Sequence, residues 1–295
     1  MLYSPITSEI HREIENYLAQ FGLFFRCFSR TKPTHSLEKK IKSKCESGCY
    51  TKNVKMLQDA IGVRIVLYFP EDIETVVFLL KKKFEIVDDA IDNPKETDFS
   101  PTRCNLIFRI QISKVPEFKA IYKKFDGYID STYEVQVRTI FSEGWHEVEH
   151  DFRYKSKECW NNHKDISRVL NGINASLVAA EWSLEKIFDE LSYRFYKNRD
   201  WELMLKNKIR LRFDGDKLCE DLSTIFSNDI NIAKKFFRIN KNSFLQLLTS
   251  TNLNHPLSLD NIIYIYNVME IKNKEIYDIT PRLIIEQFDH EPIIQ

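Results

Sequence analysis

The length, composition and charge of this chain exclude several classes of protein. It has 295 residues, 43% of them hydrophobic and 29% charged, with 7 Gly and 9 Pro, which is typical of an ordered globular protein and not of a disordered or fibrous one. Lys plus Arg and Asp plus Glu each number 43. No overall charge therefore attracts nucleic acid or an acidic membrane, and any anion site must be built locally.

The first 160 residues alternate between helical and strand periodicity. Apolar residues at helical spacing predict a helix over 8–20, and a second helix is expected to begin near His35 or Ser36, within a polar, Lys-rich segment. Further along, the pattern predicts a strand at 60–69, a helix at 71–84, strands at 105–112 and 133–138, and a helix at 141–152. This alternation predicts an α/β sandwich.

Helical spacing dominates after Trp160. It predicts helical segments at 166–191, 216–226, 232–237, 243–248, 259–269 and 281–288. We therefore expect two domains, residues 1–195 and a C-terminal helical module at 196–295.

The amino terminus and the cysteines indicate the cellular compartment of the protein. Residues 1–20 lack the apolar run of a signal peptide, and the longest apolar stretches elsewhere have the length of strands. The six cysteines are scattered without paired spacing, which predicts reduced thiols. A cytoplasmic protein with no membrane partner is expected.

Two groups of charged residues fall in the first 64 positions. Arg30 and Lys32 precede the second predicted helix, and Ser36 and Lys40 share a face on its first turns, an arrangement that suits either a polyphosphate or a solvated basic surface. Asp59 enters the 60–69 strand, where a carboxylate serves as a magnesium ligand or as a helix cap. Arg64, inside that apolar strand, needs a carboxylate or a planar base as its partner.

Two further patterns lie between 134 and 155. Strand alternation places Glu134, Gln136 and Arg138 on one face, which is either part of a site or a solvated sheet surface. The run His146–His150 reads H-E-x-x-H, the pattern of zinc metallopeptidases, but no third ligand follows at a matching distance.

In order and approximate spacing, these pieces resemble the synthetase domain of the RelA/SpoT family, including its small alarmone synthetases. The matching motifs are R-x-K-x-x-x-S-x-x-K-K at 30–40, D-A-I-G-V-R at 59–64, E-V-Q-V-R-T at 134–139 and W-H-E-V-E-H-D-F-R-Y-K at 145–155. The resemblance covers roughly residues 10–190. It implies a nucleotidyltransferase-like fold with a mixed β-sheet of about five strands flanked by helices.

The resemblance also implies roles for individual residues. Asp59 and Glu134 would hold Mg²⁺ and, with Gln136, form the catalytic centre; Glu134 is alternatively the base for the attacking hydroxyl. ATP would be bound by Arg30 and Arg64 at the adenine and by cationic and hydroxyl groups at the phosphates: Lys32, Ser36, Lys39 and Lys40. The acceptor would lie among Phe99, Arg103, Asn105, Arg138, His150 and Lys155.

One segment departs from the family pattern. Where the family has G-Y-x-S-x-H, with a tyrosine that stacks on guanine, this chain has Ser100-Pro-Thr-Arg-Cys-Asn105. Phe99 or Arg103 is a candidate replacement, since either side chain can stack on a base. The 29 residues before Arg30 leave no room for the hydrolase domain of long family members, so alarmone degradation is not expected.

The resemblance favours a pyrophosphokinase that transfers the β,γ-diphosphate of ATP to the ribose 3′-hydroxyl of GDP or GTP, forming (p)ppGpp. Two alternatives stay open: another acceptor, either an adenine nucleotide or the 3′ end of tRNA, and a catalytically silent module that senses nucleotides or binds proteins. Apart from tRNA as a substrate, no nucleic-acid partner is expected. The C-terminal module is a candidate for regulation or for homo-oligomer formation.

Overall fold

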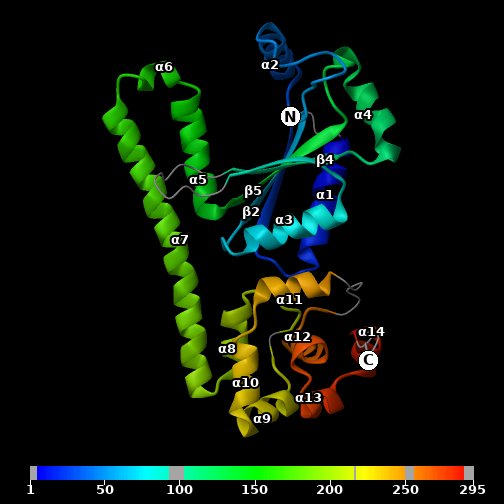
Figure 1. Ribbon diagram of the computed structural model, residues 1–295, viewed down its shortest axis with the longest axis vertical. Coiled ribbons are helices and arrows are strands. Elements are labelled where there is room, and N and C mark those ends of the chain that lie inside the picture. The colour runs from blue at the N-terminus through cyan, green and yellow to red at the C-terminus, as the bar shows by residue number, and fades with distance from the viewer. Residues whose placement is uncertain (1–4, 93–102, 216, 250–255, 289–295) are drawn as a thin grey trace, which may run out of the picture. The chain divides into compact units, whose positions relative to one another are not determined.

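The computed structural model describes residues 5–92, 103–215, 217–249 and 256–288 (Figure 1). The chain divides into two compact units: unit 1 is Met1–Tyr17 with Phe25–Ala179, and unit 2 is Leu18–Phe24 with Ala180–Gln295. Helices α1 (Pro5–Ala19) and α7 (Lys164–Asn198) contribute residues to both units. The predicted boundary at 195/196 falls inside α7.

Unit 1 is built on a mixed five-stranded sheet. Its strand order is β1-β2-β5-β4-β3; β2 and β5 run parallel, and the other neighbouring pairs are antiparallel. The strands are β1 (Phe25–Thr31), β2 (Ile61–Leu67), β3 (Ile86–Ile91), β4 (Cys104–Arg109) and β5 (Thr132–Thr139). The predicted mixed sheet with flanking helices is confirmed.

Alternation along the strands gives the sheet one apolar and one polar face. Val63 and Ile65 of β2 and Val135 and Val137 of β5 are buried, whereas the residues between them are half-buried. On the apolar side lies α3 (Asp72–Lys83), and Phe84 after it makes edge-to-face contacts with Phe108 of β4 and with Tyr17 of α1. The polar face carries the predicted site residues Arg64, Glu134 and Gln136.

Unit 1 contains further helical elements besides α1, α3 and α7. Trp145 Nε1 donates to Leu170 O at 3.2 Å and Arg153 Nη1 to Asn171 Oδ1 at 2.8 Å, so the segment after β5 is bound to the first half of α7. The further helical elements of unit 1 are α2 (Thr34–Glu46), the 3₁₀ turns η1 (Ile112–Lys114) and η2 (Lys123–Phe125), α4 (Val115–Ile121), α5 (Ile140–Val148), the π-helix η3 (Glu149–Tyr154) and α6 (Lys157–Trp160).

Most predicted elements of unit 1 are confirmed, and the short helices α4 and α6 are additions to them. The helix expected over 141–152 ends as α5 at Val148 and continues as η3. Strands β1 and β3 were not expected. Strand β1 alternates half-buried with exposed residues and carries four charged or polar side chains, and β3 is an edge strand with five exposed residues of six. Neither strand shows the apolar run that identified β2.

Unit 2 consists of helices in its described residues. Its core joins Phe226 and Phe236, with ring centroids 5.1 Å apart, to Tyr266, which also contacts Phe244. The helices are α8 (Trp201–Ile209), α9 (Glu220–Asn228), α10 (Ile230–Phe237), α11 (Lys241–Leu248), α12 (Leu259–Tyr266), the π-helix η4 (Asn267–Ile271), α13 (Lys274–Ile279) and α14 (Arg282–Phe288). The helical module is confirmed. Among the helices described here, none is long and apolar enough to cross a bilayer.

A capping box fixes the start of α5, directly after the central strand β5. The Ser142 amide donates to Thr139 Oγ1 at 3.2 Å, and the Thr139 amide donates to Ser142 Oγ at 3.0 Å. Replacing Thr139 by Val keeps the shape and removes the acceptor, so we expect a loss of about 1 kcal/mol in the free energy of unfolding. Urea unfolding measures it. The control is Thr34→Val, at an exposed first-turn threonine of α2; equal losses in both variants would contradict the capping role.

Candidate functional site

The polar face of the sheet aligns the predicted site residues in two rows. In the first row, Arg30 of β1 lies in register with Gly62 of β2, which lies in register with Glu134 of β5. The second row crosses four strands in the order Phe28, Arg64, Gln136, Asn105. Since alternate residues of a strand share a face, residues 72 positions apart in the sequence, such as Arg64 and Gln136, become neighbours.

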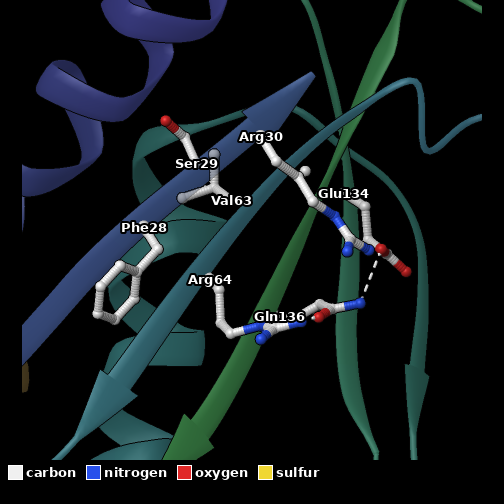
Figure 2. A pocket seen from close by; sticks show the side chains of 8 residues that line it. Phe28, Ser29, Arg30, Val63, Arg64, Glu134 and Gln136 are labelled. Atoms are coloured by element: carbon white, nitrogen blue, oxygen red, sulfur yellow. Dashed lines mark hydrogen bonds between the residues drawn. The ribbon is translucent and has the colours of Figure 1, made fainter. Parts of the chain in front are cut away.

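A shallow pocket of about 100 Å³ lies over these rows (Figure 2). Gly62 forms part of the pocket floor and has no side chain to fill it; an added Cβ would lie 3.6 Å from the Arg30 side chain. Figure 2 shows the Arg30 side chain extending towards Glu134. Phe28 is half exposed at the other end of the pocket. The remaining lining residues are Ser29, Val63, Arg64 and Gln136.

Two amides orient the Glu134 carboxylate. Asn105 Nδ2 donates to Oε1 at 3.0 Å and Gln136 Nε2 donates to Oε2 at 2.9 Å; Figure 2 shows the second of these bonds. Glu134 thus has a fixed orientation and lies against neutral donors. Asn105, predicted to bind the acceptor, lies beside the proposed catalytic carboxylate.

Arg64 connects the pocket to helix α5. Its Nε donates to Gln136 Oε1 at 3.3 Å, and its Nη1 donates to Glu143 and Glu147. Burial alone would lower the pKa of Arg64, but the two carboxylates outweigh it and raise the pKa. Arg138 Nη1 donates to the second oxygen of Glu143 at 2.9 Å. Burial and the nearby Arg64 lower the pKa of Arg138.

Sequence reasoning missed Glu143 and Glu147. They lie four residues apart and so share one face of α5, which was the available signal. On an amphipathic helix, however, such a pair is also typical of a solvated surface.

Asp59 joins two lysines from different elements. Its Oδ2 accepts from Lys32, which follows β1, and from Lys40 of α2 at 2.7 Å. All three side chains are about two-thirds buried or more. Burial alone would raise the pKa of the Asp59 carboxyl, but the two ammonium groups outweigh it and lower the pKa. The structure therefore brings Lys32 and Lys40, which were predicted to bind phosphate, beside Asp59.

The donor groups present fit a magnesium ion shared with a polyphosphate. Asp59 Oδ1 is buried and accepts no hydrogen bond from the described part of the chain, and Glu134 accepts from amides. Mg²⁺ is usually bound by one or two carboxylates together with substrate phosphates. Within the described ranges, no group of three or more His, Cys, Asp or Glu is arranged to hold a metal.

Other predicted donor residues lie on α2. Ser36 is half-buried one turn before Lys40, and its hydroxyl contacts the His35 ring at 3.2 Å. Lys39 is exposed on the helix.

The predicted acceptor residues are less closely grouped. Arg103 is exposed and makes two hydrogen bonds to the carboxylate of Asp92, at 2.9 and 3.1 Å. His150 and Lys155 are exposed, and both contact Asp151. Phe99 lies outside the described residues. Of the acceptor set, the structure brings Asn105 and Arg138 into the hydrogen-bond network of the pocket.

Comparison with known proteins identifies this part of the chain. Residues 29–159 match the family model of the region found in RelA/SpoT proteins. A GTP pyrophosphokinase of Bacillus subtilis, YjbM, is 27% identical over 130 residues, which are 43% of this chain and 54% of that protein. Residues 29–159 of this chain are therefore similar to the region found in RelA/SpoT proteins, as the four motifs predicted. The match spans about half the length of that relative.

Two solved structures are also similar. A GTP pyrophosphokinase family protein from Streptococcus pneumoniae has a TM-score of 0.48 and 18% identity, covering 62% of this chain and 88% of its own. Small alarmone synthetase 1 from Bacillus subtilis, bound to its product pppGpp, has a TM-score of 0.46 and 20% identity, covering 63% and 92%.

The Asp59 contacts should make stability depend on pH in the acid range. Because the folded-state pKa of Asp59 lies below the unfolded value of about 3.9, its contribution is complete above that value and is lost as the pH falls through the folded pKa. Urea unfolding between pH 6 and pH 3 should show the difference in unfolding free energy between the parent and Asp59→Asn shrinking as the pH falls below about 4. A difference that stays constant over this range would contradict the assignment.

Proposed function

We propose that this chain is a pyrophosphokinase that transfers the β,γ-diphosphate of ATP to the ribose 3′-hydroxyl of GDP or GTP. The observation that supports it most is the polar sheet face, which places a fixed carboxylate, Glu134, beside the arginines Arg30 and Arg64. The match of residues 29–159 to the RelA/SpoT region points to the same reaction class.

ATP is bound by cations from three elements. In this proposal the adenine stacks between Arg30 and Arg64, because guanidinium planes pack well on aromatic faces. The triphosphate lies at Lys32 and Lys40, which Asp59 already holds together. Ser36 and Lys39 add a hydroxyl and a further charge from α2.

Catalysis in this proposal is mainly positioning and charge neutralisation. The acceptor 3′-oxygen forms a bond to the β-phosphorus of ATP, the bond from that phosphorus to the α–β bridging oxygen breaks, and AMP leaves with that oxygen. The proton of the hydroxyl passes to Glu134, the one carboxylate that lines the described pocket. When bound at Asp59 and Glu134, Mg²⁺ neutralises charge on the phosphate oxygens.

The acceptor is the finer part of the proposal. Asn105 and Arg138 are the acceptor residues that join the pocket network, whereas Arg103 is held by Asp92. A purified-protein assay with ATP, Mg²⁺ and each of GDP, GTP, AMP, ADP and deacylated tRNA tests it. We expect diphosphate transfer to GDP or GTP. Transfer to another acceptor alone would replace the proposed substrate, and no transfer to any would favour a silent module.

Loss of either carboxylate should abolish most of the activity. Asp59→Asn and Glu134→Gln each remove a metal ligand, and Glu134→Gln also removes the base. We therefore expect the activation free energy to rise by about 4 kcal/mol or more, which lowers kcat by roughly three powers of ten. The measurement is the rate of AMP release with the preferred acceptor. Controls are Glu46→Gln and Asp126→Asn, which change exposed carboxylates. Either site variant turning over at near-parental rate would refute its role.

The donor cations should determine ATP affinity. Removing a charged hydrogen-bond partner costs about 1.5–3 kcal/mol, so Arg30→Ala, Lys32→Ala, Lys40→Ala and Arg64→Ala should each weaken ATP binding by roughly ten- to a hundredfold. Isothermal titration calorimetry without acceptor measures this. Lys42→Ala, at an exposed lysine of the same helix α2, should bind ATP like the parent. Unchanged affinity in all four site variants would leave this group as a solvated basic surface.

A further inference from the structure

One carboxylate on α5 lies between the two arginines of the central strands. Glu143 Oε1 accepts from Arg64 Nη1, and Glu143 Oε2 accepts from Arg138 Nη1 at 2.9 Å. The side chains of all three residues are about one-fifth exposed. A single carboxylate thus contacts both guanidinium groups through separate oxygens.

The Glu143 carboxylate, which bridges Arg64 and Arg138, offsets the repulsion between their two positive charges. Arg64 and Arg138 stand on neighbouring strands, two residues apart in register, because Arg64 lies opposite Gln136. Two half-buried guanidinium groups at this spacing repel each other, and their burial removes the water that would screen them. Glu147 adds a second negative charge, but it is about half exposed and contacts Arg64 alone.

The two arginines depend on Glu143 to different degrees. Arg64 also donates to Gln136 and Glu147. For Arg138, Glu143 is the one hydrogen-bond acceptor within the described chain. Arginine has many rotamers, and holding its plane in one orientation requires such a partner.

We propose that Glu143 is a positioning residue that fixes the guanidinium planes of Arg64 and Arg138 and so sets the binding of donor and acceptor together. This rests on the proposed function, in which Arg64 stacks on the adenine of ATP and Arg138 contacts the acceptor nucleotide. Glu143 stands on the first turns of α5, whose start is fixed by the Thr139 capping box. The bridge is therefore carried by a rigid element.

The donor side is tested by a double-mutant cycle on ATP binding. Glu143→Gln retains the shape, but it removes the charge and turns one oxygen into a donor facing a guanidinium. ATP affinity, measured by calorimetry with Mg²⁺ and no acceptor, should fall about tenfold, the size expected for one charged hydrogen bond. In an Arg64→Ala background the same change should have less than a twofold further effect, because Glu143 acts on ATP through Arg64.

The acceptor side is tested by a second cycle on kinetics. Glu143→Gln should raise the KM for the preferred acceptor about tenfold. That rise should vanish in an Arg138→Ala background and persist in an Arg64→Ala background. If Glu143→Gln instead caused a general loss of packing, it would raise the acceptor KM by the same factor in both arginine backgrounds.

The matched control is Glu149→Gln. Glu149 is about as buried as Glu143 and also pairs with an arginine, Arg153 at 3.2 Å, but it contacts neither Arg64 nor Arg138. Its change should leave ATP affinity and acceptor KM within twofold of the parent. If Glu143→Gln does not fold, as judged by circular dichroism, Glu143→Asp carries the same cycles, because the shorter side chain cannot reach both arginines.

The outcomes separate the two proposals. A parent that binds no ATP overturns the proposed function and this inference with it. A parent that binds ATP, together with parental affinity in Glu143→Gln or full additivity in both cycles, overturns the positioning role alone.

Discussion

The parallel pairing of β2 with β5 is the constraint on which the site depends. It places Gly62 opposite Glu134 and Arg64 opposite Gln136, and the antiparallel neighbours then add Arg30 on one side and Asn105 on the other. A shift of one residue in this register would turn the valines outward and the charged residues into the core. Burial of Val63, Ile65, Val135 and Val137 therefore sets the site at the same time as the core.

The sequence was sufficient for the parts of this arrangement that follow from local periodicity. The buried run at 60–69 and the alternation at 133–138 predicted β2 and β5, and the shared polar face of Glu134, Gln136 and Arg138 followed from the latter. Strand β1 was missed because its inward residues are only half-buried, so its apolar signal is weak. Arg30 was nevertheless identified, from its place in a motif.

The sequence alone did not predict which groups the charged side chains contact. That Asp59 holds both Lys32 and Lys40 depends on how α2 packs beside β2, and that Glu143 meets Arg64 depends on the turn from β5 into α5. Both contacts join residues 19 to 79 positions apart. Periodicity reports which way a side chain faces, but it does not report what it faces. His150 and Lys155 show the converse, since their motif match is clear while their side chains are exposed and contact Asp151.

Under the proposed function, charge balance explains how a chain of zero net charge would bind a polyphosphate. The four groups Arg64, Arg138, Glu143 and Glu147 cancel, and Arg30 offsets Glu134, so the excess positive charge near the pocket resides in the Lys32, Asp59 and Lys40 group. That excess is a single charge and cannot neutralise a triphosphate. The buried, unpaired oxygen of Asp59 suits a divalent cation brought with the nucleotide, since the added positive charge would meet both the carboxylate and the phosphates. In the proposed function such a site attracts free nucleotide weakly, because all but one of its own charges are already offset.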